Sequence, residues 1–269
     1  RVGNWANETA LQELRANELF EKTIQHKTTT HILQERHAAT SAVDLPPPHD
    51  DGLLRYGDVV MLSSAVGGVV AANEVRRHDP DAELCQLART AAPLVAPQKR
   101  TCWTITPAGA SPPSSDNLLR HHKPFYLVAH SAGPEPLHLM GERYTLTNAA
   151  YSESVRGGER KNLAAATTAP GSRRALWEVA FLDPRREAMA VLEPELAPVP
   201  ANAFVALRHV MTQEHLSTDS RTERSEHGSE FSVNLFTDMP VLKKYLGKRN
   251  TGTLGASNHF AFTTGPAVE

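Results

Sequence analysis

Three stretches of the chain begin with the same kind of apolar run, and this repetition constrains the fold more than any other feature. The openers are residues 59–64, 125–130 and 204–209, and each is followed by a second short apolar run and later by an aromatic strand. The framework positions of the openers and closers are Val59, Trp103, Phe125, Trp177, Phe204 and Phe260. Repeated hairpins with closing aromatic strands predict threefold internal repetition in a mainly β chain, as in a β-trefoil.

The spacing of the three units requires inserted segments. The openers start 66 and 79 residues apart, which exceeds the roughly 20–50 residues of common sequence repeats. The candidate insertions are 77–99, where Asp79-Pro80 predicts a short helix, Pro/Ser-rich 107–117, Gly/Ala/Arg-rich 152–174 and polar 217–229. We therefore expect a β-trefoil body with long inserted loops. The alternative is that any all-β chain produces resemblances between its hairpins.

The N-terminal segment differs in composition from the rest. Residues 7–36 are rich in Glu, Gln, Leu and Ala without Gly or Pro, which indicates a long amphipathic helix. The three prolines at 46–48 stop that helix and predict a stiff linker. We divide the chain into an N-terminal arm and helix (1–45), a Pro-rich linker (46–54), a β-trefoil-like domain (55–265) and a tail (266–269). The arm either packs on its own domain or lies along a partner.

Composition excludes several functional classes. A formal net charge of −2 over 269 residues means that the chain lacks the overall positive charge typical of proteins that bind nucleic acid. No apolar run approaches the roughly 18 residues of a membrane helix, and the first five residues have no apolar signal region. Cys85 and Cys102 are too few for a disulfide scaffold and fit a reducing compartment. We expect neither nucleic acid nor a membrane as a partner.

The sequence contains no recognisable catalytic or metal-binding constellation. Gly67-Gly68 is typical of a hairpin turn rather than a phosphate loop, and Ser131 has no nucleophile-elbow motif around it. His121 and His122 would point to opposite faces of a strand. His130 and His209 hold matching positions at the ends of two openers, which indicates repeat geometry rather than a ligand set. We predict no catalytic, cofactor-binding or metal-binding residue, and therefore no enzyme.

The densest basic cluster lies near the C-terminus. Asp238 is a plausible N-cap of a short helix ending at Gly247. The cluster at the end of this helix consists of Lys243, Lys244, Lys248 and Arg249. Cations are favourable at a helix C-terminus in any case, so the cluster is either a solvated face or a site for an acidic partner.

Five segments in this order resemble a known family. They are Arg1-Val2-Gly3-Asn4-Trp5, Tyr56-Gly57-Asp58-Val59-Val60-Met61-Leu62, Trp177-Glu178-Val179-Ala180-Phe181-Leu182-Asp183-Pro184, Val199-Pro200-Ala201-Asn202-Ala203 and Asn258-His259-Phe260. Together they resemble the cilia- and flagella-associated protein 161 family of axonemal microtubule inner proteins, over nearly the whole chain to Gly265. The loops at 108–122 and 152–174 depart from any pattern of that family.

The resemblance implies a non-enzymatic protein with a MIR-type β-trefoil body, located in the axoneme of a cilium or flagellum. Its implied partners are tubulin, at the luminal wall of the doublet microtubule, and neighbouring microtubule inner proteins. The candidate partner contacts are Arg1, Asn4 and Trp5 in the arm and Lys243, Lys244, Lys248 and Arg249 in the basic cluster. Trp5 either supplies stiff contact area to a partner or folds back onto the trefoil. The alternative function is a β-trefoil binding module for a carbohydrate or a peptide.

Overall fold

The strands form three consecutive groups of four, each running from a sequence-predicted opener to its aromatic closer. The computed structural model describes residues 5–24, 28–73, 84–91, 96–109, 116–130, 136–143, 162–167, 171–190, 192, 196–225, 227–238 and 253–266. The strands are β1 (Val59–Ser64), β2 (Val70–Asn73), β3 (Leu84–Arg89) and β4 (Cys102–Pro107); β5 (Phe125–Ala129), β6 (Leu137–Glu142), β7 (Asn162–Thr167) and β8 (Trp177–Ala180); β9 (Phe204–His209), β10 (Leu216–Ser225), β11 (Gly228–Leu235) and β12 (Phe260–Thr263).

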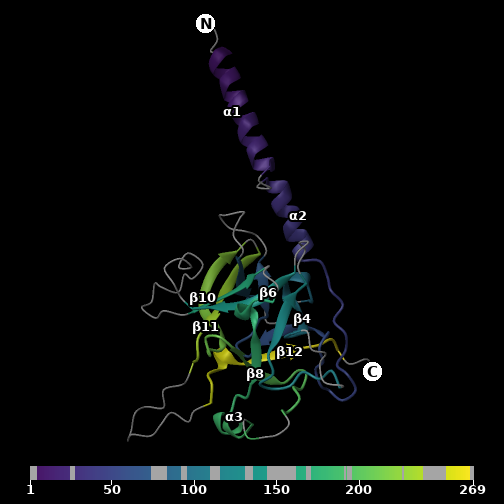
Figure 1. The fold of residues 1–269 in the computed structure, drawn as a ribbon. Helices are drawn as coiled ribbons and strands as arrows, with labels where there is room; N and C mark the ends of the chain where they lie inside the picture. The colour runs from purple at the N-terminus through teal and green to yellow at the C-terminus, as the bar shows by residue number, and fades with distance from the viewer. Residues whose placement is uncertain are drawn as a thin grey trace, which may run out of the picture.

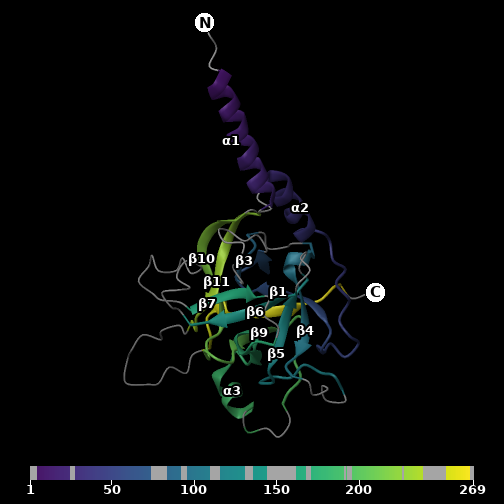
Figure 2. The same cartoon turned by 45° about the horizontal axis from the view of Figure 1, so that its top comes forward.

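The first and last strands of each group close a barrel. Antiparallel pairing runs from β1 to β4, β5, β8, β9, β12 and back to β1. The inner strands form three hairpins, β2–β3, β6–β7 and β10–β11, whose second strands also pair with one another. A six-stranded barrel capped by three hairpins is a β-trefoil, so the predicted fold class is confirmed. Strands β3 and β11 of the cap lie nearer the arm, and the barrel lies below them (Figures 1 and 2).

The hydrophobic core fills this barrel because side chains alternate across each strand. Its largest fully buried side chains are Trp103, Trp177, Phe125, Phe260, Phe262, Leu54, Leu62, Leu87, Ile105, Leu119, Leu127 and Leu139. The two tryptophans and Phe260 occupy equivalent positions in the three closing strands, and they pair with Val60, Phe125 and Val205 of the opening strands. Four of the six predicted framework residues, Trp103, Phe125, Trp177 and Phe260, therefore lie in the barrel core.

The strand pairing corrects the predicted register at the other two framework residues, Val59 and Phe204. Val60, Phe125 and Val205 are equivalent, so the units are offset by 65 and 80 residues, rather than 66 and 79. Val60 and Val205 are 0% and 4% exposed, whereas Val59 is only half-buried and Phe204 is 52% exposed. A slip of one residue moves a strand side chain to the opposite face, which is why Val59 and Phe204 lie outside the core.

The same register shows that His130 and His209, which the sequence placed at matching positions, are not structurally equivalent. Trp103 pairs with Ala129 and Trp177 pairs with His209, so His209 is equivalent to Ala129 and not to His130. His130 instead matches Val210. The backbone N–H of His130 donates to the Cys102 carbonyl and that of Val210 donates to the Leu176 carbonyl, both at 3.0 Å. The two histidines therefore have different surroundings.

The third strand of each unit falls where the sequence predicted insertions. Strand β3 lies within 77–99, β7 within 152–174, and the β10–β11 hairpin covers the polar segment 217–229. The short helix expected in 77–99 is wrong over residues 84–89, which form a strand. Asp79 and Pro80, where that helix was expected to begin, lie outside the described residues. These strands are held by partners on both sides: β7, for example, pairs with both β6 and β3. Long-range pairing therefore overrides weak local patterns such as the alanines at 164–166.

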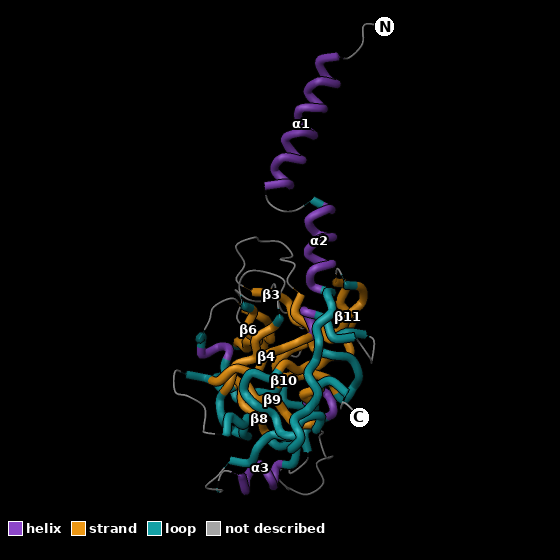
Figure 3. The backbone as a smooth tube through the Cα atoms, turned by 90° about the vertical axis from the view of Figure 1, so that its right-hand side faces the viewer, coloured by secondary structure: helices purple, strands orange, loops and turns teal. Residues whose placement is uncertain are grey.

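The chain in front of the barrel contains two helices, where the sequence predicted one over 7–36. Helix α1 covers Trp5–Ile24 and α2 covers Thr29–Ala39. Thr28 is the N-cap of α2, and its hydroxyl accepts a hydrogen bond from the His31 amide at 3.4 Å. Helix α1 projects away from the body, while the short helix α3 (Pro184–Ala190) lies at the opposite end (Figures 1 and 3). No described helix is long and apolar enough to cross a membrane.

The predicted linker is part of the body. The amide of Gly265 donates to the Pro46 carbonyl at 2.8 Å, and Leu54 is 1% exposed. Leu54, Leu119 and Val199 form a closed ring of backbone hydrogen bonds at one end of the barrel, each donating to the next at 2.8–3.0 Å. These three residues are again offset by 65 and 80 positions. The segment 46–54 therefore ends inside the threefold core rather than at a free hinge.

Candidate functional site

Most of the predicted partner contacts lie outside the described residues. This holds for Arg1 and Asn4, for the basic cluster Lys243, Lys244, Lys248 and Arg249, and for most of the helix predicted from Asp238 to Gly247. Trp5 is the first residue of α1, but its side chain is not among those described. These contacts therefore stay predictions.

Helix α1 carries large apolar side chains that its own domain does not cover. All its described side chains, residues 8–23, are exposed. The large apolar side chains on the arm are Leu11, Leu14, Leu19 and Phe20 in α1 and Leu33 in α2, and they are 51–65% exposed. The sequence left open whether the arm packs on its own domain, and the structure places α1 away from it (Figure 2). A helix with this surface is suited to contact a partner.

The base of the arm, in contrast, is fixed to the trefoil. Ala39 at the end of α2 is 3% exposed. The Val43 amide donates to the Pro97 carbonyl at 3.1 Å, and the Lys99 amide donates to the Ser41 carbonyl at 3.0 Å. Val43 and Leu45 also pack against an apolar cluster on the barrel. The end of α2 is thus anchored while α1 extends outward.

A buried ion pair lies within the hairpin cap. The Arg100 guanidinium donates to the Glu230 carboxylate, and both side chains are at most 5% exposed. The amide of Asn73 and the hydroxyl of Ser225 donate to the other carboxylate oxygen. Burial alone would raise the pKa of Glu230, but Arg100 and these donors lower it overall. Burial, with repulsion from Arg100, lowers the pKa of His227 to about 4.

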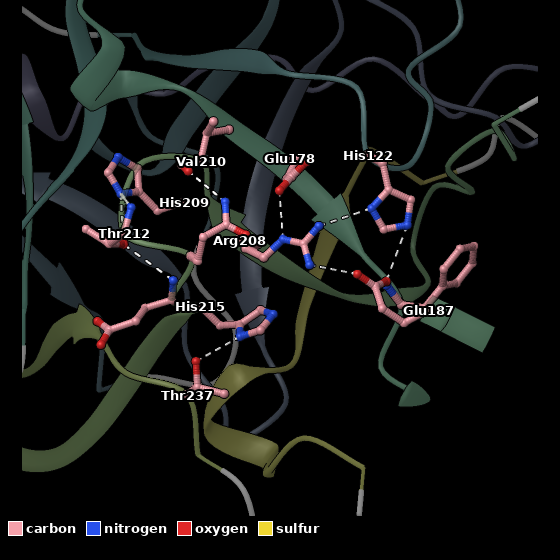
Figure 4. Close-up of polar contacts among 12 residues, drawn as sticks. His122, Glu178, Glu187, Arg208, His209, Val210, Thr212, His215 and Thr237 are labelled. Atoms are coloured by element: carbon pink, nitrogen blue, oxygen red, sulfur yellow. Dashed lines mark hydrogen bonds and ion pairs between the residues drawn. The ribbon is translucent and has the colours of Figure 1, made fainter. Parts of the chain in front are cut away.

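A second charge network connects α3 to the barrel (Figure 4). Arg208 on β9 donates to Glu178 at 2.7 Å and to Glu187 of α3 at 2.9 Å. A third nitrogen of its guanidinium lies 3.2 Å from His122 Nδ1. Glu187 also accepts from the Phe181 amide at 2.8 Å. Each charged group in this network has partners, which is typical of a structural role.

The histidines occupy separate structural positions. His121 stacks on Phe181 with ring centroids 3.8 Å apart, whereas His122 faces Arg208. His209 lies 3.0 Å from the Thr212 hydroxyl and 2.8 Å from the Arg174 carbonyl, and it is fully buried. Burial lowers the pKa of His209. Within the described part of the chain, no three His, Cys, Asp or Glu residues are grouped as a metal site would require.

The sequence did not reveal the residues of these two networks. Arg100 and Glu230 are 130 positions apart, and Arg208 and His122 are 86 apart. No local spacing indicates such pairs. The networks position elements against one another, and in neither do the described contacts place a solvent-accessible nucleophile beside a base.

A further feature of the described residues is a cavity between the first and third units, with both polar and apolar side chains in its walls. Its volume is about 370 Å³. It is lined by Val66, Arg89, Ser217, Thr218, Asp219, Ser220, Phe236, Asp238 and Ser257. None of these residues was singled out as a ligand contact by the sequence, because they come from five separate segments.

Comparisons with known proteins support the fold and extend no further. No protein-family model and no curated protein matches the sequence. A Caenorhabditis elegans protein of unknown function has a similar structure, with a TM-score of 0.53, 11% identity, and coverage of 80% of this chain and 98% of that one. The SDF2-like protein from Arabidopsis thaliana has a TM-score of 0.51 and 10% identity, and the match covers 81% of this chain and 99% of that one.

A third similar structure belongs to a larger protein. It is a chain of the Saccharomyces cerevisiae protein O-mannosyltransferase Pmt1-Pmt2 complex bound to the sugar donor, with a TM-score of 0.53 and 12% identity. The match covers 86% of this chain but only 29% of that one. At these identities the likeness shows the fold alone. The chain is therefore a MIR-like β-trefoil with a helical arm.

Proposed function

We propose that this chain is a structural, non-catalytic protein of the ciliary or flagellar axoneme, bound to the luminal wall of the doublet microtubule. The observation that carries the proposal is the arm. Helix α1 is 20 residues long, leaves the body, and exposes Leu11, Leu14, Leu19 and Phe20. A helix gains most of its stability in a protein from packing its apolar side chains against another surface, and a partner can supply that surface for α1.

The body is suited to serve as a rigid mount for such an arm. The barrel is closed, and Ser41 and Val43, just after α2, are held by backbone hydrogen bonds to Lys99 and Pro97. A rigid mount reduces the ordering cost of binding, because the base of the arm is already positioned. The exposed apolar side chains of the helix can then be buried against the partner.

Charge and sequence resemblance support tubulin and neighbouring microtubule inner proteins as the partners. The net charge of −2 suits the inner wall better than the acidic outer tails of tubulin, which would favour a strongly basic protein. Five segments that follow one another from Arg1 to Phe260 resemble the cilia- and flagella-associated protein 161 family. Contacts repeated along a lattice retain weak binders, and binding only the assembled lattice stabilises it.

Co-assembly with tubulin tests the proposal. The 269-residue chain is polymerised with tubulin, and the fraction that sediments after a salt wash is measured. A variant with Leu11, Leu14, Leu19 and Phe20 replaced by Gln keeps good helix formers but loses the apolar side chains. We expect the salt-resistant fraction to fall at least tenfold.

The matched control replaces exposed polar residues of the same helix, Gln12→Ala, Asn17→Ala and Thr23→Ala, and should retain binding. Equal retention of the apolar variant and the wild type would contradict the role of the arm. A cryo-electron microscopy map of the intact doublet tests the location independently. Density for the trefoil on the outer surface would overturn the luminal assignment.

A further inference from the structure

Two pairs of exposed apolar side chains lie at opposite ends of the molecule. On α1, Leu11 and Leu14 are 51% and 59% exposed. At the other end, Met189 of α3 is 65% exposed, and Leu192 is 84% exposed. The Leu192 amide donates to the Met189 carbonyl at 2.9 Å, which keeps these two residues together. The barrel lies between the two ends (Figures 1 and 3).

The apolar pair on α1 continues into an acidic pair along the same side of the helix. Glu18 and Glu21 follow Leu11 and Leu14 at the spacing i, i+3, i+7 and i+10. Residues with this spacing share one side of an α-helix, and all four are exposed. We call these four residues the α1 strip. It changes from apolar to acidic in the direction of the chain.

The charged and apolar residues of α3 follow the reverse order. Arg185 and Arg186 are exposed and precede Met189 by four and three positions, which places them on its side of the helix. Leu192 lies three positions beyond Met189. We call these four residues the α3 strip. It changes from basic to apolar in the direction of the chain.

The barrel holds α3 in place, so the α3 strip is a fixed surface. Glu187, the one acidic residue of α3, accepts from Arg208 at 2.9 Å and from the Phe181 amide at 2.8 Å. Ala190 is 4% exposed. Because the barrel neutralises Glu187, the outward side of α3 is left with the positive charge of its two arginines.

The two strips are complementary when the helices run antiparallel. In that arrangement the leucines of the α1 strip meet the apolar end of the α3 strip, and the glutamates meet the arginines. Helix α1 has 20 residues and is therefore about 30 Å long, enough to cover the 7 residues of α3. Apolar burial with flanking opposite charges gives such a contact both attraction and a fixed direction.

Other arrangements of the α1 strip are less favourable. Two α1 helices in parallel would place Glu18 and Glu21 against the same residues of the other copy, and antiparallel pairing would place leucines against glutamates. Like charges repel, and carboxylates lose hydration against apolar side chains. The α3 strip of the same molecule lies at the opposite end from the arm, and α1 points away from it (Figure 1).

We propose that α1 of one copy packs antiparallel along α3 of a second copy, so that copies of this chain join head to tail. Each copy has one strip of each kind at opposite ends, so the contact is heterologous and continues beyond two copies. The contact needs no tubulin and goes beyond the microtubule proposal. Leu19 and Phe20 lie outside the α1 strip, so both contacts can use the same helix.

Sedimentation velocity of the 269-residue chain without tubulin tests the proposal. We expect the average mass to rise with protein concentration past that of a dimer, and to fall with added salt, which screens exposed charge pairs. Glu18→Lys with Glu21→Lys changes the α1 strip, and Arg185→Glu with Arg186→Glu changes the α3 strip. Each double variant sets like charges against one another and should weaken association at least about tenfold.

Mixing the two double variants provides the decisive measurement. In the mixture the changed α1 of one variant meets the changed α3 of the other with opposite charges, and the remaining contact has the original charges. Association in an equimolar mixture should therefore return to the wild-type level. The matched control is Glu8→Lys with Glu13→Lys, which makes the same charge change outside the α1 strip and should associate like the wild type.

Several outcomes would overturn head-to-tail association. These are a chain that stays monomeric at every concentration, a mixture that associates no better than its components, a control that loses association, and a mass that levels off at a dimer. A monomeric chain whose co-sedimentation with tubulin falls in Arg185→Glu with Arg186→Glu would assign the α3 strip to tubulin instead. Self-association without tubulin binding would support this contact and contradict only the microtubule proposal.

Discussion

At the residue scale, the third unit solves a hydrogen-bonding problem differently from the other two. Trp103 Nε1 donates to the Val70 carbonyl at 3.2 Å, and Trp177 Nε1 donates to the Leu139 carbonyl at 2.9 Å. Phe260 at the equivalent position has no donor. In its place, the Asn258 side-chain amide donates to Leu216, the residue equivalent to Val70, at 2.9 Å. The carbonyl is satisfied in all three units, as burial demands.

Removing these donors should destabilise the protein. Trp177→Phe leaves the Leu139 carbonyl unpaired, and Asn258→Leu leaves the Leu216 and Phe236 carbonyls unpaired. We expect each variant to lose about 2–3 kcal/mol in the free energy of unfolding measured with urea. Phe204→Ala serves as the control, because its exposed side chain should change stability by less than about 0.5 kcal/mol. A large loss at Phe204 would contradict the observed register.

His121 should make stability depend on pH. Burial, with repulsion from His122, lowers its pKa from 6.5 to about 4. Between these values the unfolded chain binds more protons, so this contribution to stability is complete above pH 6.5 and is lost as pH falls toward 4. His121→Phe should reduce the loss between pH 7 and pH 4 by about 2–3 kcal/mol. Urea titrations at several pH values measure this, with exposed His37→Gln as the control. If the free energy of unfolding of His121→Phe depended on pH as steeply as that of the wild type, the lowered pKa of His121 would be refuted.

At the element scale, the charge network around Arg208 attaches α3 to the barrel. Arg208→Met removes the cation shared by Glu178 and Glu187. These side chains are 12–22% exposed, so we expect a loss of about 2 kcal/mol, below the range for a fully buried pair. Hydrogen exchange should accelerate at residues 184–190 more than in the barrel. Arg55→Met breaks the more exposed pair with Asp51 and should destabilise the protein much less than Arg208→Met. Uniform acceleration across the barrel would contradict a local role.

At the scale of the whole molecule, the ring of Leu54, Leu119 and Val199 couples the three units. Each belongs to a different unit, and each backbone N–H donates to another member of the ring. Leu54→Ala should therefore cost about 2–5 kcal/mol despite its place in a segment that the sequence predicted to be a linker. Tryptophan fluorescence and circular dichroism should report one shared transition. Separate transitions, or a loss typical of an exposed residue, would show that the units are not coupled here.

The arm and the candidate sites could be predicted only in part. The residues of 7–36 predicted a helix because Leu, Ala, Glu and Gln favour it locally, but the separate helix α2 with its Thr28 cap was missed. The α3 strip was missed because the exposure of Met189 and Leu192 depends on how the barrel holds α3. Arg208 and Glu187 were missed because nothing in the local sequence indicates which distant side chains will meet.

The sequence by itself determined the number of units and the positions of their opening and closing strands. Those strands are β-branched and aromatic, and such residues carry a strong local preference for strands. The tertiary structure decided the inner strands β3, β7 and β11, the one-residue register that buries Val60 and Val205, and the side chains brought together in the networks and the cavity. These depend on closing a barrel whose paired strand residues, such as Ser64 and Phe260, are far apart in the chain. A local pattern contains no information about such closure.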